Sequence, residues 1–112
     1  MTKYLFIYRL PSTPDAPPRS PEEMQQMFAR WRAWKEKFKD AVVDLGDGLK
    51  PSGKLLTDGK VTDGPFIEAK EIIGGYSIIA SESYDGALGV ARECPMVLMP
   101  GATIEIRELM GF

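Results

Sequence analysis

The chain has 112 residues, a length that predicts one domain over residues 1–112 and is too short for a second hydrophobic core. Its 14 basic and 16 acidic side chains give a net charge of −2, which argues against nucleic acid or an anionic membrane surface as a partner. With no histidine and one cysteine, the chain cannot build an internal disulfide, a histidine-based catalytic triad or a usual zinc or haem site, so we expect no metal and no cofactor.

The first predicted element is a strand over residues 4–10, which is aromatic, β-branched and apolar at odd and even positions alike. A strand of this kind needs cover on both faces of its sheet. No apolar run near Met1 is long enough for a signal peptide or a membrane span, so we expect a cytoplasmic protein. Four prolines within residues 11–19 then predict a loop, because proline lacks a backbone donor and disfavours helix in the residue before it.

A long helix is predicted from Ser20 to about Asp40. Ser20 and Glu23 can form a capping box, and Pro21 suits the first helical turn. Apolar side chains then recur at steps of three and four residues, at Met24, Met27, Phe28, Trp31, Trp34 and Phe38. We interpret this stripe as core packing against a sheet. The alternative is an aromatic platform for a ligand, with Trp31 or Trp34 as its member.

The middle of the chain predicts a short, irregular strand within residues 42–56, because glycine and proline recur there. A hairpin follows around Asp58-Gly59, since a type I′ turn requires positive φ at both of its central positions. A second turn, at Asp63-Gly64-Pro65, comes only a few residues later. Residues 68–71 form a charged connector to the next strand.

The most apolar run, residues 72–80, predicts the best strand of the chain. Gly74-Gly75 inside it predicts a bulge or the close approach of another backbone or a ligand. Ser83 can cap a second helix over residues 84–94, which Pro95 ends. The last strand, residues 103–109, alternates, so Ile104 and Ile106 face one way and Thr103, Glu105 and Arg107 face the other.

This order of elements predicts an α+β fold, a ferredoxin-like βαββαβ sandwich with an extra hairpin. Two helices can cover one face of such a sheet only. The other face would be partly exposed in a monomer, so we expect a homodimer formed through this open sheet face, with a barrel-like cavity or cleft between the subunits. In a chain of this length, a deep pocket is expected to need the second subunit.

Asp63 is the candidate catalytic residue. It can serve as a general base at the mouth of the cleft if burial or a charged neighbour moves its pKa. The simpler reading is a turn residue, because Asp before Gly folds back on its own backbone amides. Lys70 and Glu71 form a solvated connector in the simple reading, and Lys70 is a candidate substrate-binding residue in the other.

Glu105 and Arg107 lie on the open face, and dimerisation would turn Arg107 into an anchor for a carboxylate or phosphate. Tyr76 or Tyr8 can supply a proton donor to the same cleft, although a buried tyrosine satisfied by the backbone is more common. Cys94 falls at a helix C-terminus, where the helix dipole disfavours a thiolate, so we interpret it as a small buried apolar residue.

Several of these segments together resemble a known family. Asp63-Gly64-Pro65-Phe66, then Glu68, Lys70 and Glu71, then Gly74-Gly75 are similar to the signature of the DGPF group in the YCII-related (YciI-like) superfamily. The likeness extends over the Trp-containing helix, Cys94-Pro95 and residues 101–107. The resemblance implies a small ferredoxin-like subunit that pairs with a second copy into a dimeric α+β barrel.

The resemblance carries little mechanism. Better-studied YciI-like relatives are associated with a His-Asp pair and with elimination chemistry, and that pair cannot be transferred to a chain without histidine. The family pattern often has Thr where this chain has Ala69. DGPF-type proteins are often encoded beside alternative sigma factors, which implies a regulatory or stress-linked role.

Three readings of the function stay open at this point, and the simplest is a stable dimer whose cleft is filled by its own side chains. The other two assign a role. In the first, a small organic molecule binds in the intersubunit cleft, with metal-independent lyase or isomerase chemistry on a small organic acid as an extension. In the second, the protein is a non-catalytic accessory module. Convergent polar groups in a pocket favour the first, and an exposed apolar patch outside the dimer interface favours the second.

Overall fold

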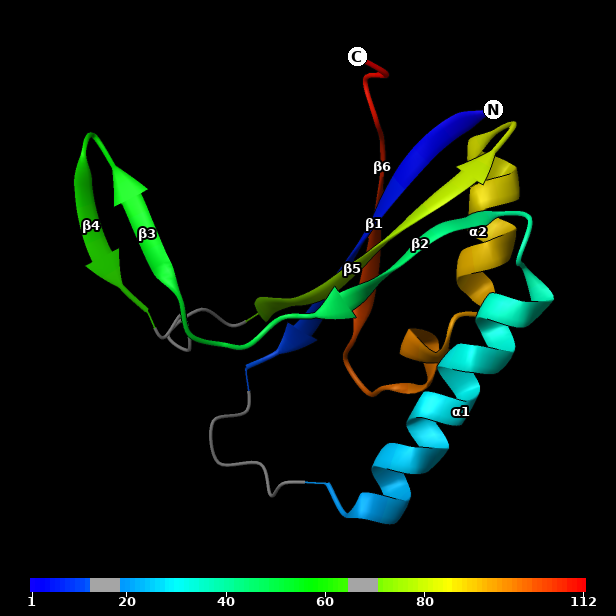
Figure 1. Ribbon diagram of the computed structural model, residues 1–112, viewed down its shortest axis with the longest axis horizontal. Helices are drawn as coiled ribbons and strands as arrows, with labels where there is room; N and C mark the ends of the chain where they lie inside the picture. Colours follow the sequence, from blue (N-terminus) through cyan, green and yellow to red (C-terminus); the bar gives the residue numbers. More distant parts are fainter. Residues whose placement is uncertain (13–18, 65–70) are drawn as a thin grey trace.

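The computed structural model describes residues 1–12, 19–64 and 71–112 (Figure 1). Its elements, in chain order, are β1 (Thr2–Pro11), α1 (Pro21–Lys37), β2 (Val42–Gly48), β3 (Lys54–Thr57), β4 (Lys60–Asp63), β5 (Glu71–Ser81), α2 (Tyr84–Arg92), the 3₁₀ turn η1 (Pro95–Leu98) and β6 (Thr103–Glu108). Among the described residues, no helix is both long and apolar enough to cross a membrane.

The main sheet has the strand order β2-β5-β1-β6, and each neighbouring pair is antiparallel. This order, with α1 after β1 and α2 after β5, confirms the predicted ferredoxin-like α+β fold. Strands β3 and β4 form the extra hairpin as a separate two-stranded sheet. The dimeric, barrel-like assembly stays a prediction.

Both helices cover one face of the main sheet (Figure 1). Tyr4, Phe6 and Tyr8 of β1 are buried on this face, whereas the alternate residues Leu5 and Ile7 are only half-buried. Alternation along β1 therefore defines a helix-covered face and an open face of the sheet. In β6 the register places Ile106 opposite Phe6 and Glu105 opposite Ile7, as the predicted alternation requires.

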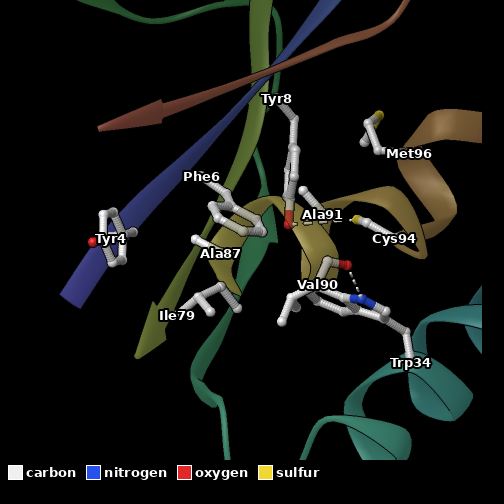
Figure 2. Close-up of a cluster of buried hydrophobic side chains, with 10 residues drawn as sticks. All are labelled: Tyr4, Phe6, Tyr8, Trp34, Ile79, Ala87, Val90, Ala91, Cys94 and Met96. Atoms are coloured by element: carbon white, nitrogen blue, oxygen red, sulfur yellow. Dashed lines mark hydrogen bonds between the residues drawn. The ribbon is translucent and has the colours of Figure 1, made fainter. Parts of the chain in front are cut away.

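The core on the covered face joins the sheet to both helices. Phe6, Ile79 and Cys94 are fully buried there. Trp34 of α1 is buried as well, and its Nε1–H donates to the carbonyl oxygen of Val90 in α2 at 3.0 Å (Figure 2). Indole burial combined with a satisfied N–H is the usual arrangement for a core tryptophan. The core reading of Trp34 is thus confirmed.

The helix ends differ slightly from the sequence prediction. Ser20 caps α1 as predicted, because its Oγ accepts from the Glu23 amide at 3.2 Å. The helix ends at Lys37 rather than near Asp40, since the chain turns at Phe38 to enter β2. Helix α2 ends at Arg92, two residues early, because Pro95 disfavours helical backbone at Cys94, whose φ and ψ are −67° and 138°.

The β3–β4 hairpin projects away from the main sheet (Figure 1). Its turn has φ of 52° at Asp58 and 77° at Gly59, which confirms the predicted turn with two positive φ values. Leu55, Leu56 and Val61 on its strands are all more than half exposed. The described hairpin therefore carries an apolar surface outside the main core.

The pairing of β2 with β5 depends on Gly46. Its φ is 74°, and a Cβ at this position would lie 1.8 Å from the carbonyl oxygen of Tyr76. Gly59 has a similar φ of 77°, but a Cβ there would meet nothing within 4 Å. The two glycines therefore share one backbone constraint and differ in steric space.

We predict that Gly46→Ala lowers the free energy of unfolding by about 2–5 kcal/mol, the sum of left-handed strain and a clash with backbone. Gly59→Ala should cost only the strain, about 1–2 kcal/mol. Urea unfolding followed by circular dichroism measures both. Equal losses in the two variants would contradict the close approach of β2 and β5 at Gly46.

Candidate functional site

A cavity of about 530 Å³ lies between α1 and the covered face of the sheet, within one chain. One chain therefore forms a pocket by itself, on the helix-covered face, in addition to the cleft expected between subunits on the open face. The physical reason is an unfilled floor: Gly48, Gly74 and Gly75 line the cavity at the ends of β2 and β5. Because glycine has no side chain, the space below the first turns of α1 is not filled from the sheet.

The wall of the cavity is apolar and rich in methionine. Two segments contribute to this wall. Helix α1 supplies Met24, Met27, Phe28 and Trp31, and the segment around η1 supplies Met96 and Met99. Methionine is flexible and polarisable, so such a wall adapts to the shape of an apolar guest. Met24 and Phe28 are exposed by 45% and 51%, which leaves the cavity open to solvent beside α1.

Trp31 separates the cavity from the core. Its ring meets the Tyr8 ring edge-on at a centroid distance of 5.4 Å and the Trp34 ring at 5.6 Å. Trp31 lines the cavity, whereas Trp34 does not. The two readings of the aromatic stripe are therefore divided between neighbouring turns of one helix: Trp34 belongs to the core, and Trp31 forms part of a possible binding surface.

The glycines of the floor also let the backbones approach. A Cβ at Gly75 would lie 2.8 Å from the Asp47 carbonyl oxygen, and one at Gly74 would meet the Leu10 side chain at 2.4 Å. The β1–β5 register shifts between Tyr8 and Arg9 at this level. The predicted irregularity at Gly74-Gly75 is thus confirmed as a bulge beside the cavity.

A short chain of buried polar groups lies behind the cavity wall. The Tyr8 hydroxyl donates to Ser77 Oγ at 2.7 Å, and Ser77 Oγ donates to the Leu45 carbonyl oxygen at 2.6 Å. The Cys94 thiol lies 3.7 Å from the Tyr8 oxygen (Figure 2). Tyr8 therefore presents its ring to the cavity, while its hydroxyl is already satisfied.

Burial raises the pKa of the Tyr8 phenol far above its ordinary value and also raises the pKa of the Cys94 thiol. Both groups are neutral at pH 7. The interpretation of Cys94 as a buried apolar residue is confirmed. The suggestion that Tyr8 faces the open cleft is wrong, because the alternation of β1 turns it to the helix-covered face.

Arg19 supplies the positive charge at the cavity. It is exposed, lines the cavity, and directs Nη1 to Met27 Sδ at 3.1 Å and Nη2 to Met99 Sδ at 3.7 Å. Asp47 is the one acidic residue in the described lining, and its carboxylate accepts from the Gly48 amide at 2.7 Å. Sequence reasoning missed Arg19, since it stands before the helix in a proline-rich loop.

The open face holds three of the predicted site residues. The register places Tyr76 opposite Ile7, and Ile7 opposite Glu105. Glu105 accepts from Arg9 Nε at 3.0 Å and from Arg107 Nη1 at 3.4 Å. These hydrogen bonds, from Arg9 first and then Arg107, lower the pKa of the Glu105 carboxyl.

Arg9 was missed by the sequence analysis, although the alternation of β1 could have placed it on the open face beside Glu105. Arg107 can still bind an anion, because its side chain is 70% exposed and its guanidinium has further N–H donors. Tyr76 also borders the cavity, at the irregular edge between β2 and β5.

Asp63 lies apart from this cluster. It ends β4 in the projecting hairpin (Figure 1), its side chain is 75% exposed, and Lys54 Nζ lies 2.6 Å from its carboxylate. Within one chain the structure does not bring Asp63 together with Arg107. Lys70 lies outside the described residues, as do Pro65 and Phe66 of the four-residue signature.

Comparison with known protein families identifies residues 18–112 as a YCII-related domain. The chain belongs to the YCII-related family. The match confirms the resemblance seen in the sequence, and it covers both helices, five of the six strands and the cavity lining except Tyr8 and Leu10 of β1. Among curated proteins, none matches the chain. The narrower assignment to the DGPF group stays a prediction.

The raised pKa of Tyr8 predicts that this YCII-related protein loses stability at alkaline pH. Tyr8 keeps its proton when folded but loses it near pH 10 when unfolded. The stability gained from the buried neutral phenol is therefore complete below about pH 10 and falls as the pH rises further.

We predict that Tyr8→Phe costs about 1 kcal/mol of stability at pH 7, because Ser77 and Cys94 each lose a hydrogen-bond partner. The gap to the wild type should narrow by up to about 1 kcal/mol between pH 10 and 11. Urea unfolding at pH 7, 10 and 11 measures the gap. A gap that does not change with pH would contradict the raised pKa.

Proposed function

We propose that this YCII-family protein binds a small organic molecule in the cavity between α1 and the sheet. The cavity itself carries the proposal. Its volume of about 530 Å³ lies within the range of roughly 300–1,000 Å³ typical of small-molecule sites. A mainly apolar lining with few polar groups is also typical of such sites.

The lining favours recognition of an apolar or aromatic body. The rings of Tyr8 and Trp31 and the side chains of Met27 and Met96 offer shape and dispersion contacts. The Tyr8 hydroxyl is engaged with Ser77 and keeps its proton. The described lining therefore supports binding more directly than acid–base chemistry. The lyase or isomerase activity expected from the sequence stays a prediction.

The cavity can be tested with N-phenylnaphthylamine, a neutral probe whose fluorescence rises in apolar surroundings. We expect saturable binding with one site per chain and quenching of tryptophan emission, because Trp31 lines the cavity. Gly48→Leu should abolish the signal. A Cβ at Gly48 meets only the Gly74 carbonyl oxygen at 3.6 Å, so a side chain fits there and fills the floor.

Arg107→Ala and Asp63→Asn are the controls for probe binding. Arg107 lies on the opposite face of the sheet and Asp63 in the projecting hairpin. Both variants should bind the probe as the wild type does. Absence of a saturable signal, or an unchanged signal in correctly folded Gly48→Leu, would reject the cavity as the binding site.

We further propose that two chains pair through the open sheet face into a homodimer. Leu5, Ile7 and Ile78 on this face are half-buried in the single chain, and Arg9, Glu105 and Arg107 stand beside them. A second sheet would bury the apolar side chains and enclose the arginine cluster. An intersubunit cleft that uses Arg107, Glu105 and Tyr76 rests on this pairing.

The accessory role has one observation in its favour. Leu55, Leu56 and Val61 expose apolar surface on the hairpin, away from the main sheet. Exposed apolar surface of this kind is typical of protein interaction sites. The hairpin thus supports a protein partner as a second candidate function, alongside the ligand in the cavity.

We predict that Ile7→Glu converts the homodimer to a monomer, because it places a charge at the centre of the apolar open face. Native mass spectrometry of the wild type and the variant gives the subunit count directly. Arg32→Gln, which also lowers the net charge by one unit but on the exposed side of α1, should leave the dimer intact. A wild-type monomer at micromolar concentration would overturn the pairing.

A further inference from the structure

We propose that the ligand of the cavity is an amphipathic monocarboxylate, with its apolar body between α1 and the sheet and its carboxylate on Arg19. This inference rests on the proposed ligand-binding function and specifies the chemical class of ligand. It begins from the position of Arg19, which lies at the rim of an otherwise apolar cavity.

The contacts of Arg19 leave its hydrogen-bonding capacity largely unused. Among the described residues, its guanidinium donates to two thioether sulfurs, Met27 Sδ at 3.1 Å and Met99 Sδ at 3.7 Å. Thioether sulfur is a weak acceptor. A carboxylate offers two oxygens that match the guanidinium fork and would replace weak contacts by charge-assisted ones.

Two other arginines differ in this respect, whereas Arg30, Arg32 and Arg92 resemble Arg19 in joining no ion pair within the described residues but do not line the cavity. Arg9 and Arg107 both pair with Glu105. Within the described residues, no ion pair joins Arg19 to a carboxylate, and Asp47 across the cavity is engaged by the Gly48 amide. Within the described residues, the cavity therefore combines an apolar interior with one arginine at its rim that pairs with no carboxylate, while Asp47 stands as a separate negative charge.

The number of charges selects among anions. The described lining holds one cationic side chain, Arg19, which can pair with a single negative charge, and one acidic side chain, Asp47, which repels any further negative charge. A monocarboxylate needs one such partner, whereas a phosphate monoester carries up to two charges at pH 7. The two methionine sulfurs that now touch Arg19 would then contact the carbons beside the carboxylate, where their polarisability is an advantage.

Naphthaleneacetate and naphthaleneacetamide form a matched pair for the test, because they share one shape and differ in charge. Each competes against N-phenylnaphthylamine bound to the full chain. We expect the acid to displace the probe at a concentration about tenfold lower than the amide. Arg19→Gln should remove this preference by weakening the acid alone, and Arg19→Lys should restore part of it.

Arg32→Gln is the charge-matched control, since Arg32 is exposed on α1 and does not line the cavity. It should keep the full preference for the acid. Probe binding with acid and amide within about twofold of each other would overturn the carboxylate inference while leaving the cavity as a binding site. Equal weakening of acid, amide and probe by Arg19→Gln would also overturn it, because Arg19 would then act on the cavity's shape. Failure of the probe itself to bind would reject the proposed function instead.

Discussion

The burial of Trp34 determines where α1 lies on the sheet. It is the only buried residue of that helix, and its indole N–H is tied to the Val90 carbonyl of α2. The helix is therefore anchored to the core near its C-terminus, while Met24, Met27 and Phe28 of its N-terminal half line the cavity. The cavity follows from this attachment at one end, because Met24 and Phe28 stay about half exposed and do not pack into the core.

Glycine in the opposite layer completes the arrangement. Gly46, Gly48, Gly74 and Gly75 remove side chains where β2 and β5 pass under the start of α1, and they let the two backbones approach. The helix is held at its C-terminal end, and the sheet carries glycines opposite its N-terminal end. The space between them is therefore left unfilled. The fold and the candidate site are thus two results of one distribution of large and small residues.

Much of the fold could be predicted, because local rules determine it. A few neighbouring residues are enough to predict the α1 cap at Ser20, the turn at Asp58-Gly59 and the alternation of β6. The cavity could not be predicted in the same way. Helical periodicity shows that Trp31 and Trp34 share a stripe but not which of them meets side chains from the sheet. Arg9 and Arg19 acquire their meaning only from residues far away in the sequence, Glu105 and Met99.

The buried polar chain has a consequence for folding specificity. Tyr8 on β1, Ser77 on β5 and the Leu45 carbonyl on β2 satisfy one another in a line across three strands. A slip of one residue between β1 and β5 would turn Tyr8 or Ser77 to the opposite face, and a slip between β5 and β2 would move the Leu45 carbonyl away from Ser77. Either slip would leave buried polar groups without partners in the core. Apolar residues tolerate such slips better, since one aliphatic neighbour can replace another. The Tyr8–Ser77–Leu45 line therefore fixes the register of β1, β5 and β2. The glycine-rich edge of the sheet would by itself specify this register only weakly.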